Sequence, residues 1–311
     1  MPWIRRLDYC SLALVGHLVA PAGAFVFQAF TCHRGWAMSI VAISETAGSM
    51  GIEIGRKLAE SLGWEFADRE ILSKASEQFG ENVTDLRHSV EEKPTLWERF
   101  SDTQHRYKAY VEAIMLEMAA RDNVVLAGRS STIVLRQVPH VVRVRTSAPE
   151  YTRAQRLENE MGLTHEAALN YVRHSDRERA ARVKFLYQLD VDDPLLYDLV
   201  LNTERLTVEK GAALIRETLR DERFQSIEPG RRAVVDLSLA ALARAALMAH
   251  PQVEANSLTV TCKDGHVSLT GGVREDEQRT VAADVVRRIP GVVSVLNEIV
   301  VMGLGRTIIG L

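Results

Sequence analysis

The sequence predicts an α/β domain, with a parallel sheet flanked by helices, followed by a small α+β module. In the first part, short β-branched runs such as 39–43 and 124–127 alternate with helical periodicity. That alternation is typical of parallel strands joined by crossover helices. Residues 237–303 instead follow the order α-β-β-α-β, in a stretch too short for helical crossovers throughout.

Four segments follow from these patterns. We expect an amino-terminal extension over 1–37, the α/β domain over 38–224, a polar linker containing Pro-Gly over 225–236, and the small module over 237–303. The extension has two interpretations. Its apolar run after two arginines is similar to a secretory signal, and it is also consistent with a mis-assigned start or a disordered extension before the strand that opens at Met38. We favour the second interpretation.

Composition sets the broad class. The chain has 311 residues, of which 46% are hydrophobic, and this is enough apolar material for two folded cores. Its net charge of −3 gives no electrostatic case for nucleic acid as a partner. The three cysteines lie far apart and form no disulfide framework or metal site, which favours a cytoplasmic location.

The elements of the α/β domain are expected in a clear order. A turn-rich loop over 44–51 follows the first strand, and a helix carrying Ile54, Leu58 and Leu62 ends at Gly63. Asp68 is an expected N-cap for the next helix. Later helices are expected from Pro94 to Arg121, from Pro149, from Thr164 and over 208–219, with strands at 140–144 and 197–202.

The loop after the first strand has the position of a phosphate loop. Such a loop has the pattern Gly-x-x-x-x-Gly-Lys-Ser/Thr, in which backbone N–H groups and the lysine bind phosphate and the hydroxyl holds Mg²⁺. Here Glu45, Met50, Gly51 and Ile52 take the four signature positions, so every signature residue is missing. Gly48 and Gly51 are what remains of the glycine-rich character.

This strand, loop and helix resemble the cytidylate-kinase-like family of P-loop proteins. The residues that match the family pattern are Ile43, Ser44, Gly48, Ser49, Gly51 and Ile54. Glu45, Met50 and Ile52 stand where the family carries arginine, glycine and arginine. The departures remove two positive charges and add a negative one beside the expected phosphates, and each could cost about 1 to 3 kcal/mol of anion binding.

The resemblance implies a set of site residues and ligands. ATP and Mg²⁺ would bind at the loop, with no separate metal site. The implied nucleotide- and phosphate-binding residues are Gly48, Ser49, Gly51, Asp68, Arg129 and Arg153. Arg129 follows a buried strand, and its planar guanidinium suits the phosphate of a monophosphate acceptor. The implied catalytic residues are the lid arginines Arg173, Arg177 and Arg179.

The carboxy-terminal module resembles the BON domain. The match is carried by 260–273, with Gly265 in a hairpin turn, and by 289–299. The resemblance implies a phospholipid or protein partner and no catalysis by this module.

Two functions remain open at this stage. The first is transfer of a phosphoryl group from ATP to a nucleoside monophosphate, and the intact Arg129 and lid arginines favour it. The second is a catalytically inactive nucleotide-sensing or interaction protein, and Glu45, Met50 and Ile52 favour it. The sequence does not name the acceptor.

Overall fold

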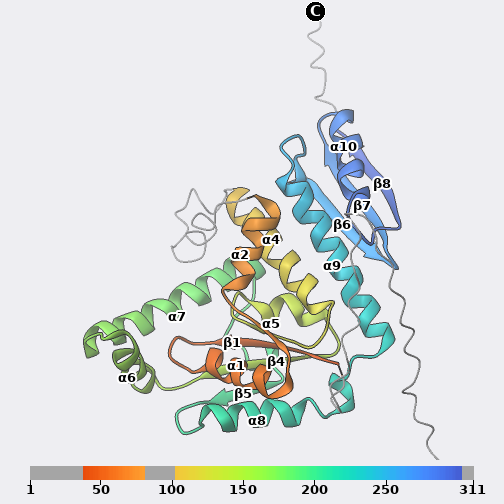
Figure 1. The fold of residues 1–311 in the computed structure, drawn as a ribbon. Helices are drawn as coiled ribbons and strands as arrows, with labels where there is room; N and C mark the ends of the chain where they lie inside the picture. The colour runs from red at the N-terminus through yellow and green to blue at the C-terminus, as the bar shows by residue number, and fades with distance from the viewer. Residues whose placement is uncertain (1–37, 81–101, 303–311) are drawn as a thin grey trace, which may run out of the picture. The chain divides into compact units, whose positions relative to one another are not determined.

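The computed structural model describes residues 38–80 and 102–302 (Figure 1). The expected extension and the expected helix start at Pro94 lie outside these residues. Within them, a parallel sheet has the strand order β2-β3-β1-β4-β5. Its strands are β1 (Ile40–Glu45), β2 (Glu65–Ala67), β3 (Val124–Ala127), β4 (Val141–Ser147) and β5 (Leu199–Asn202).

Helices cover both faces of this sheet because its central strand is apolar on both sides. Ile40 and Ala42 of β1 enter one core cluster, and Val41 and Ile43 enter another, as the alternation of side chains along a strand requires. The helices are α1 (Gly51–Leu62), α2 (Glu70–Phe79), α4 (Asp102–Ala119), α5 (Ser131–Val134), α6 (Glu150–Met161), α7 (His165–Tyr187) and α8 (Val208–Thr218). Short 3-10 turns are η2 (Leu135–Gln137), η3 (Pro194–Leu196) and η4 (Glu222–Phe224).

Most helix ends confirm their expected signals. Gly63 ends α1 in the left-handed region with φ 69°, and the Thr164 hydroxyl accepts from the Ala167 N–H at the start of α7. The expected cap at Asp68 is wrong. Arg69 takes the cap position of α2 and makes no side-chain cap bond.

The expected linker over 225–236 is mostly helical. Helix α9 (Glu228–Ala249) begins inside it, with Pro229 in its first turn, where a missing N–H costs nothing. Gly230 lies against His140, and a Cβ there would be 3.0 Å from the imidazole Nδ1. The Pro-Gly pair therefore starts a helix and packs closely, where the sequence pattern indicated a turn.

The carboxy-terminal module is a three-stranded sheet with helices. It contains η5 (Ala255–Ser257), β6 (Leu258–Lys263), β7 (His266–Val273), α10 (Asp276–Arg287) and β8 (Ser294–Val301). β6 and β7 are antiparallel, and β7 and β8 are parallel. The Asp236 carboxylate of α9 accepts from the N–H groups of Asp264 and Gly265 in the hairpin turn at 2.8 and 3.0 Å. Of the helices in the described ranges, none has the length and apolarity to cross a membrane.

Candidate functional site

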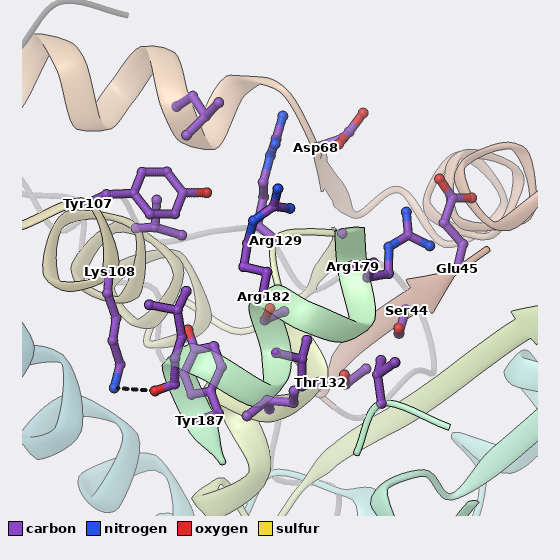
Figure 2. A pocket seen from close by; sticks show the side chains of 18 of the residues that line it. Ser44, Glu45, Asp68, Tyr107, Lys108, Arg129, Thr132, Arg179, Arg182 and Tyr187 are labelled. Carbon is purple, nitrogen blue, oxygen red and sulfur yellow. Dashed lines mark hydrogen bonds between the residues drawn. The ribbon is translucent and has the colours of Figure 1, made fainter. Parts of the chain in front are cut away.

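A polar cavity of about 430 Å³ lies at the carboxyl end of the parallel strands. This volume is sufficient for a small ligand. The last residues of β1 and residues that follow β2 and β3 meet α4 and α7 there (Figure 2). Because β1 lies between β3 and β4, the strand order reverses beside it, and open α/β sheets bind ligands at such a point. The charged side chains that line the cavity are Glu45, Asp68, Arg69, Lys108, Arg129, Arg179 and Arg182.

Arg129 is held in the cavity by an unusual backbone turn after β3. Gly128, Arg129 and Ser130 have φ values of 73°, 52° and 61°, three successive residues in the left-handed region. Only glycine adopts this region without cost, so two residues here carry roughly 1 kcal/mol or more of strain each. Hydrogen bonds over-determine the turn, because the Gly128 N–H donates to Ile43 O at 2.8 Å and Ser131 N–H to Gly128 O at 2.9 Å.

Helix α7 contributes two more arginines to the cavity. Arg179, a predicted lid residue, and Arg182, which the sequence analysis missed, both line it. Their spacing of three residues puts them on one face of the helix, and that spacing was the available signal. Figure 2 shows Arg129, Arg179 and Arg182 beside one another, with Glu45 beyond Arg179 and with Tyr107, Lys108 and Tyr187 at the other end.

Two buried arginine N–H groups in the cavity have no acceptor in the part of the chain that the structure describes. Arg129 Nε and Arg179 Nη1 are buried and lack a hydrogen-bond partner among the described residues. Burial also lowers the pKa of Arg179, an effect that the neighbouring Glu45 opposes. A buried donor without an acceptor costs about 1 to 3 kcal/mol. An anionic ligand in the cavity would supply the missing acceptors.

Asp68 faces the same cavity, close to the turn that carries Arg129. A Cβ on Gly128 would lie 3.6 Å from Asp68 Oδ1. Burial raises the pKa of the Asp68 carboxyl, while the positive charge of Arg129 lowers it. Asp68 therefore lies at the wall of the same cavity as Arg129, and the role that the resemblance implies for it stays a prediction.

Gly48 and Ser49 make contacts within the protein and do not line the cavity. The Ser49 hydroxyl is 2.9 Å from the Thr146 hydroxyl, and the Ser49 carbonyl accepts from the Thr203 hydroxyl at 3.0 Å. Gly48 has φ 76°, and a Cβ there would be 2.7 Å from Arg153 O. These contacts fix the loop against β4 and α6.

Arg153 is the best example of a predicted site residue in a structural position. Its side chain is 4% exposed and is absent from the cavity wall. It makes a bidentate pair with Asp176 at 2.8 and 3.2 Å and donates to Ala148 O at 2.8 Å. Of the three predicted lid arginines, Arg173 and Arg177 lie on exposed surface. Arg173 pairs with Glu150, and the Arg177 Nε donates to Arg173 O.

The carboxylate of Glu45, the last residue of β1, turns back onto the start of α1. Its Oε2 accepts the Ile52 N–H at 3.0 Å. Burial raises the pKa of Glu45 from the ordinary 4.5 to about 7, while Arg179 and the Ile52 N–H lower it. The Glu45 carboxyl therefore changes charge near neutral pH.

This raised pKa has a consequence for stability. Because the folded protein binds the Glu45 proton more tightly than the unfolded chain, ionisation opposes folding. We expect the free energy of unfolding to fall as pH rises from about 4.5 to about 7, by on the order of 2 kcal/mol, relative to a Glu45→Gln variant. Urea unfolding of both proteins at several pH values measures the difference, and parallel pH profiles would contradict the assignment.

The fold and this cavity define the class of protein. A parallel sheet of order 2-3-1-4-5, flanked by helices and with a loop at the phosphate-loop position after β1, has the fold of P-loop kinases. The cytidylate kinase-like family matches residues 40–205, more than half of the chain, and the chain belongs to this family. The BON domain matches residues 236–303.

Several known proteins are similar to the same part of the chain. The cytidylate kinase of Ignicoccus hospitalis is 28% identical over 184 residues, which cover 58% of this chain and 99% of that protein. The cytidylate kinase of Pyrobaculum calidifontis is 27% identical over 172 residues, 55% of this chain and 87% of that protein. A solved structure of an uncharacterized protein from Eubacterium ventriosum is similar over 58% of this chain and 98% of its own, with 18% identity and a TM-score of 0.48. The phospholipid or protein partner expected for the BON domain stays a prediction.

Proposed function

We propose that this protein binds a nucleoside monophosphate in the arginine-lined cavity. One observation carries the proposal: Arg129, Arg179 and Arg182 come from two separate elements to one cavity, and two of them hold buried N–H groups that find no acceptor in residues 38–80 and 102–302. A phosphate group would accept from these donors. Guanidinium groups suit it because their planar fork pairs with two phosphate oxygens.

Phosphoryl transfer from ATP is the second candidate function. The observation that favours it is Arg179, which lies between the acceptor cavity and the start of α1, where a lid arginine would neutralise a moving phosphoryl group. The loop itself fits this function less well. Ile52 offers no oxygen to Mg²⁺, and Gly51 offers no ammonium group to the phosphates. ATP and Mg²⁺ therefore belong to this second candidate.

Calorimetric titration of the full chain with cytidine monophosphate, without ATP or Mg²⁺, tests the proposal. We expect binding, and we expect Arg129→Ala to weaken it roughly 10- to 100-fold, the effect of losing about 1.5 to 3 kcal/mol of charge-assisted hydrogen bonding. Arg129→Lys keeps the positive charge and loses the planar guanidinium, so its affinity for cytidine monophosphate should lie between those of the wild type and Arg129→Ala. Uridine and adenosine monophosphates and inorganic phosphate, titrated in parallel, measure the contribution of the base.

Arg177→Ala is the matched control, because Arg177 lies on α7 with Arg179 but outside the cavity. It should bind like the wild-type protein. No binding of any monophosphate, or equal weakening by Arg129→Ala and Arg177→Ala, would overturn the proposal. A coupled assay with ATP and Mg²⁺ tests the second candidate, and turnover equal to the enzyme-free background would exclude it.

A further inference from the structure

The start of α1 already holds an anion, the carboxylate of Glu45. The first N–H groups of a helix have no partner within it, and the helix dipole makes this end attractive to negative charge. Met50, the cap residue, makes no side-chain cap bond. The Ile52 N–H instead donates to Glu45 Oε2 at 3.0 Å. The Ile52 N–H, which a phosphate at this helix end would contact, is therefore already hydrogen-bonded to the Glu45 side chain.

On the side of Gly51, little room remains beside this carboxylate. A Cβ on Gly51 would lie 2.7 Å from Glu45 Oε2 and 2.5 Å from the Thr146 hydroxyl. Gly51 is the position at which a standard phosphate loop carries its lysine, and a lysine would not fit without moving Glu45. Arg179, whose buried Nη1 has no hydrogen-bond partner among the described residues, faces the same carboxylate across the cavity (Figure 2).

We propose that Glu45 occupies the place of a donor phosphate at the start of α1, so that a triphosphate enters only when this carboxyl is neutralised or displaced. The inference rests on the proposed function, because it concerns the donor side of the same cavity. Glu45 is a specificity-determining residue in this view. The arginines accept a monophosphate, while Glu45 excludes a triphosphate whose terminal groups would reach α1.

The charges around Glu45 set the pH dependence of this exclusion. Arg179 of α7 favours its ionised form, and Glu53 of α1 and Asp68 after β2 disfavour it. With a pKa of about 7, the carboxyl is largely ionised at pH 8 and largely protonated at pH 6. Triphosphate binding should therefore be accompanied by proton uptake at Glu45 and should be weakest above pH 7.

The test is titration of the full chain with ATP and, separately, with cytidine monophosphate at pH 6, 7 and 8. Three variants accompany the wild-type protein. Glu45→Gln keeps the shape and removes the charge, Glu45→Gly removes the occupying group, and Glu60→Gln makes the same chemical change at an exposed position near the end of α1. We expect Glu45→Gln to bind ATP about 10-fold more tightly than the wild type at pH 8, with a smaller difference at pH 6.

Each outcome has one meaning. Tighter ATP binding by Glu45→Gln or Glu45→Gly, with cytidine monophosphate binding unchanged and Glu60→Gln like the wild type, supports the proposal. If cytidine monophosphate binds but ATP affinity and its pH dependence are the same in every variant, Glu45 does not exclude the donor and the proposal fails. If ATP binds no variant while cytidine monophosphate does, the proposal also fails. If cytidine monophosphate binds none, the proposed function fails.

Discussion

Replacement of Arg153 by alanine should lower the free energy of unfolding by about 3 kcal/mol. Arg153 joins three parts of the chain, because it donates to Ala148 O and Ala47 O and pairs with Asp176 of α7 through both carboxylate oxygens. Its removal leaves a carboxylate and two carbonyl groups without a donor. Asp176 keeps 29% of its side-chain surface, so water repairs part of the loss and the cost stays below that of a fully buried pair.

The chain offers a matched control for this experiment. Arg173 of α7 pairs with Glu150 of α6, the same two helices with the charges reversed, but both side chains are about half exposed. Exposed ion pairs contribute about 0 to 1 kcal/mol, so Arg173→Ala should leave stability within about 0.5 kcal/mol of the wild type. Urea unfolding of the two variants measures the contrast. Equal effects would mean that Arg153 is not the structural residue that its burial indicates.

The fold was largely predictable because its signals are local. β1, α1, β3 and the start of α7 are predicted by runs of β-branched residues, helical spacing and cap residues within a few positions. Where prediction failed, the deciding contact lies far away in sequence. The Pro-Gly of the expected linker lies in the first turn of α9, where Gly230 packs against His140, about ninety positions earlier.

Some of the predicted site residues line the cavity and others do not, and the difference has a physical cause. Arg129 and Asp68 line the cavity as expected, because a residue just after a parallel strand has little freedom to point elsewhere. Arginines on helices are harder to assign, because charge and spacing do not say which face is buried. Arg153 and Arg179 both have acidic and basic neighbours in the sequence, yet the first donates to Ala47 of the loop after β1 and the second lines the cavity.

Glu45 was identified from the sequence only as a departure from a pattern. The sequence indicated a repulsive charge beside the expected phosphates. It could not indicate that the carboxylate is bound to the Ile52 N–H, because this contact depends on the side-chain conformation at the end of β1. A substitution that removes a motif residue can thus also place a competing group in the ligand position.

The largest single-residue effect in the BON domain is expected for Gly271→Ala. Gly271 lies in β7 opposite Leu258, with φ 117°, a conformation almost confined to glycine. A Cβ there would lie 2.1 Å from the backbone oxygen of Ser257, so β6 or η5 must move. Strain and steric overlap together should cost roughly 3 kcal/mol or more. Hydrogen exchange of the peptides covering β6 and β7 should show the loss of protection directly.

Gly63→Ala separates the two contributions. Gly63 also has a positive φ, 69°, but no atom lies within 4 Å of the place its Cβ would take. This variant carries only the conformational cost of about 1 kcal/mol, and exchange in β6 and β7 should stay as in the wild type. If Gly271→Ala were no more destabilising than Gly63→Ala, the backbone at Ser257 would have to move away from β7 at little cost in free energy. The close approach of the two strands would then not be what requires glycine at this position.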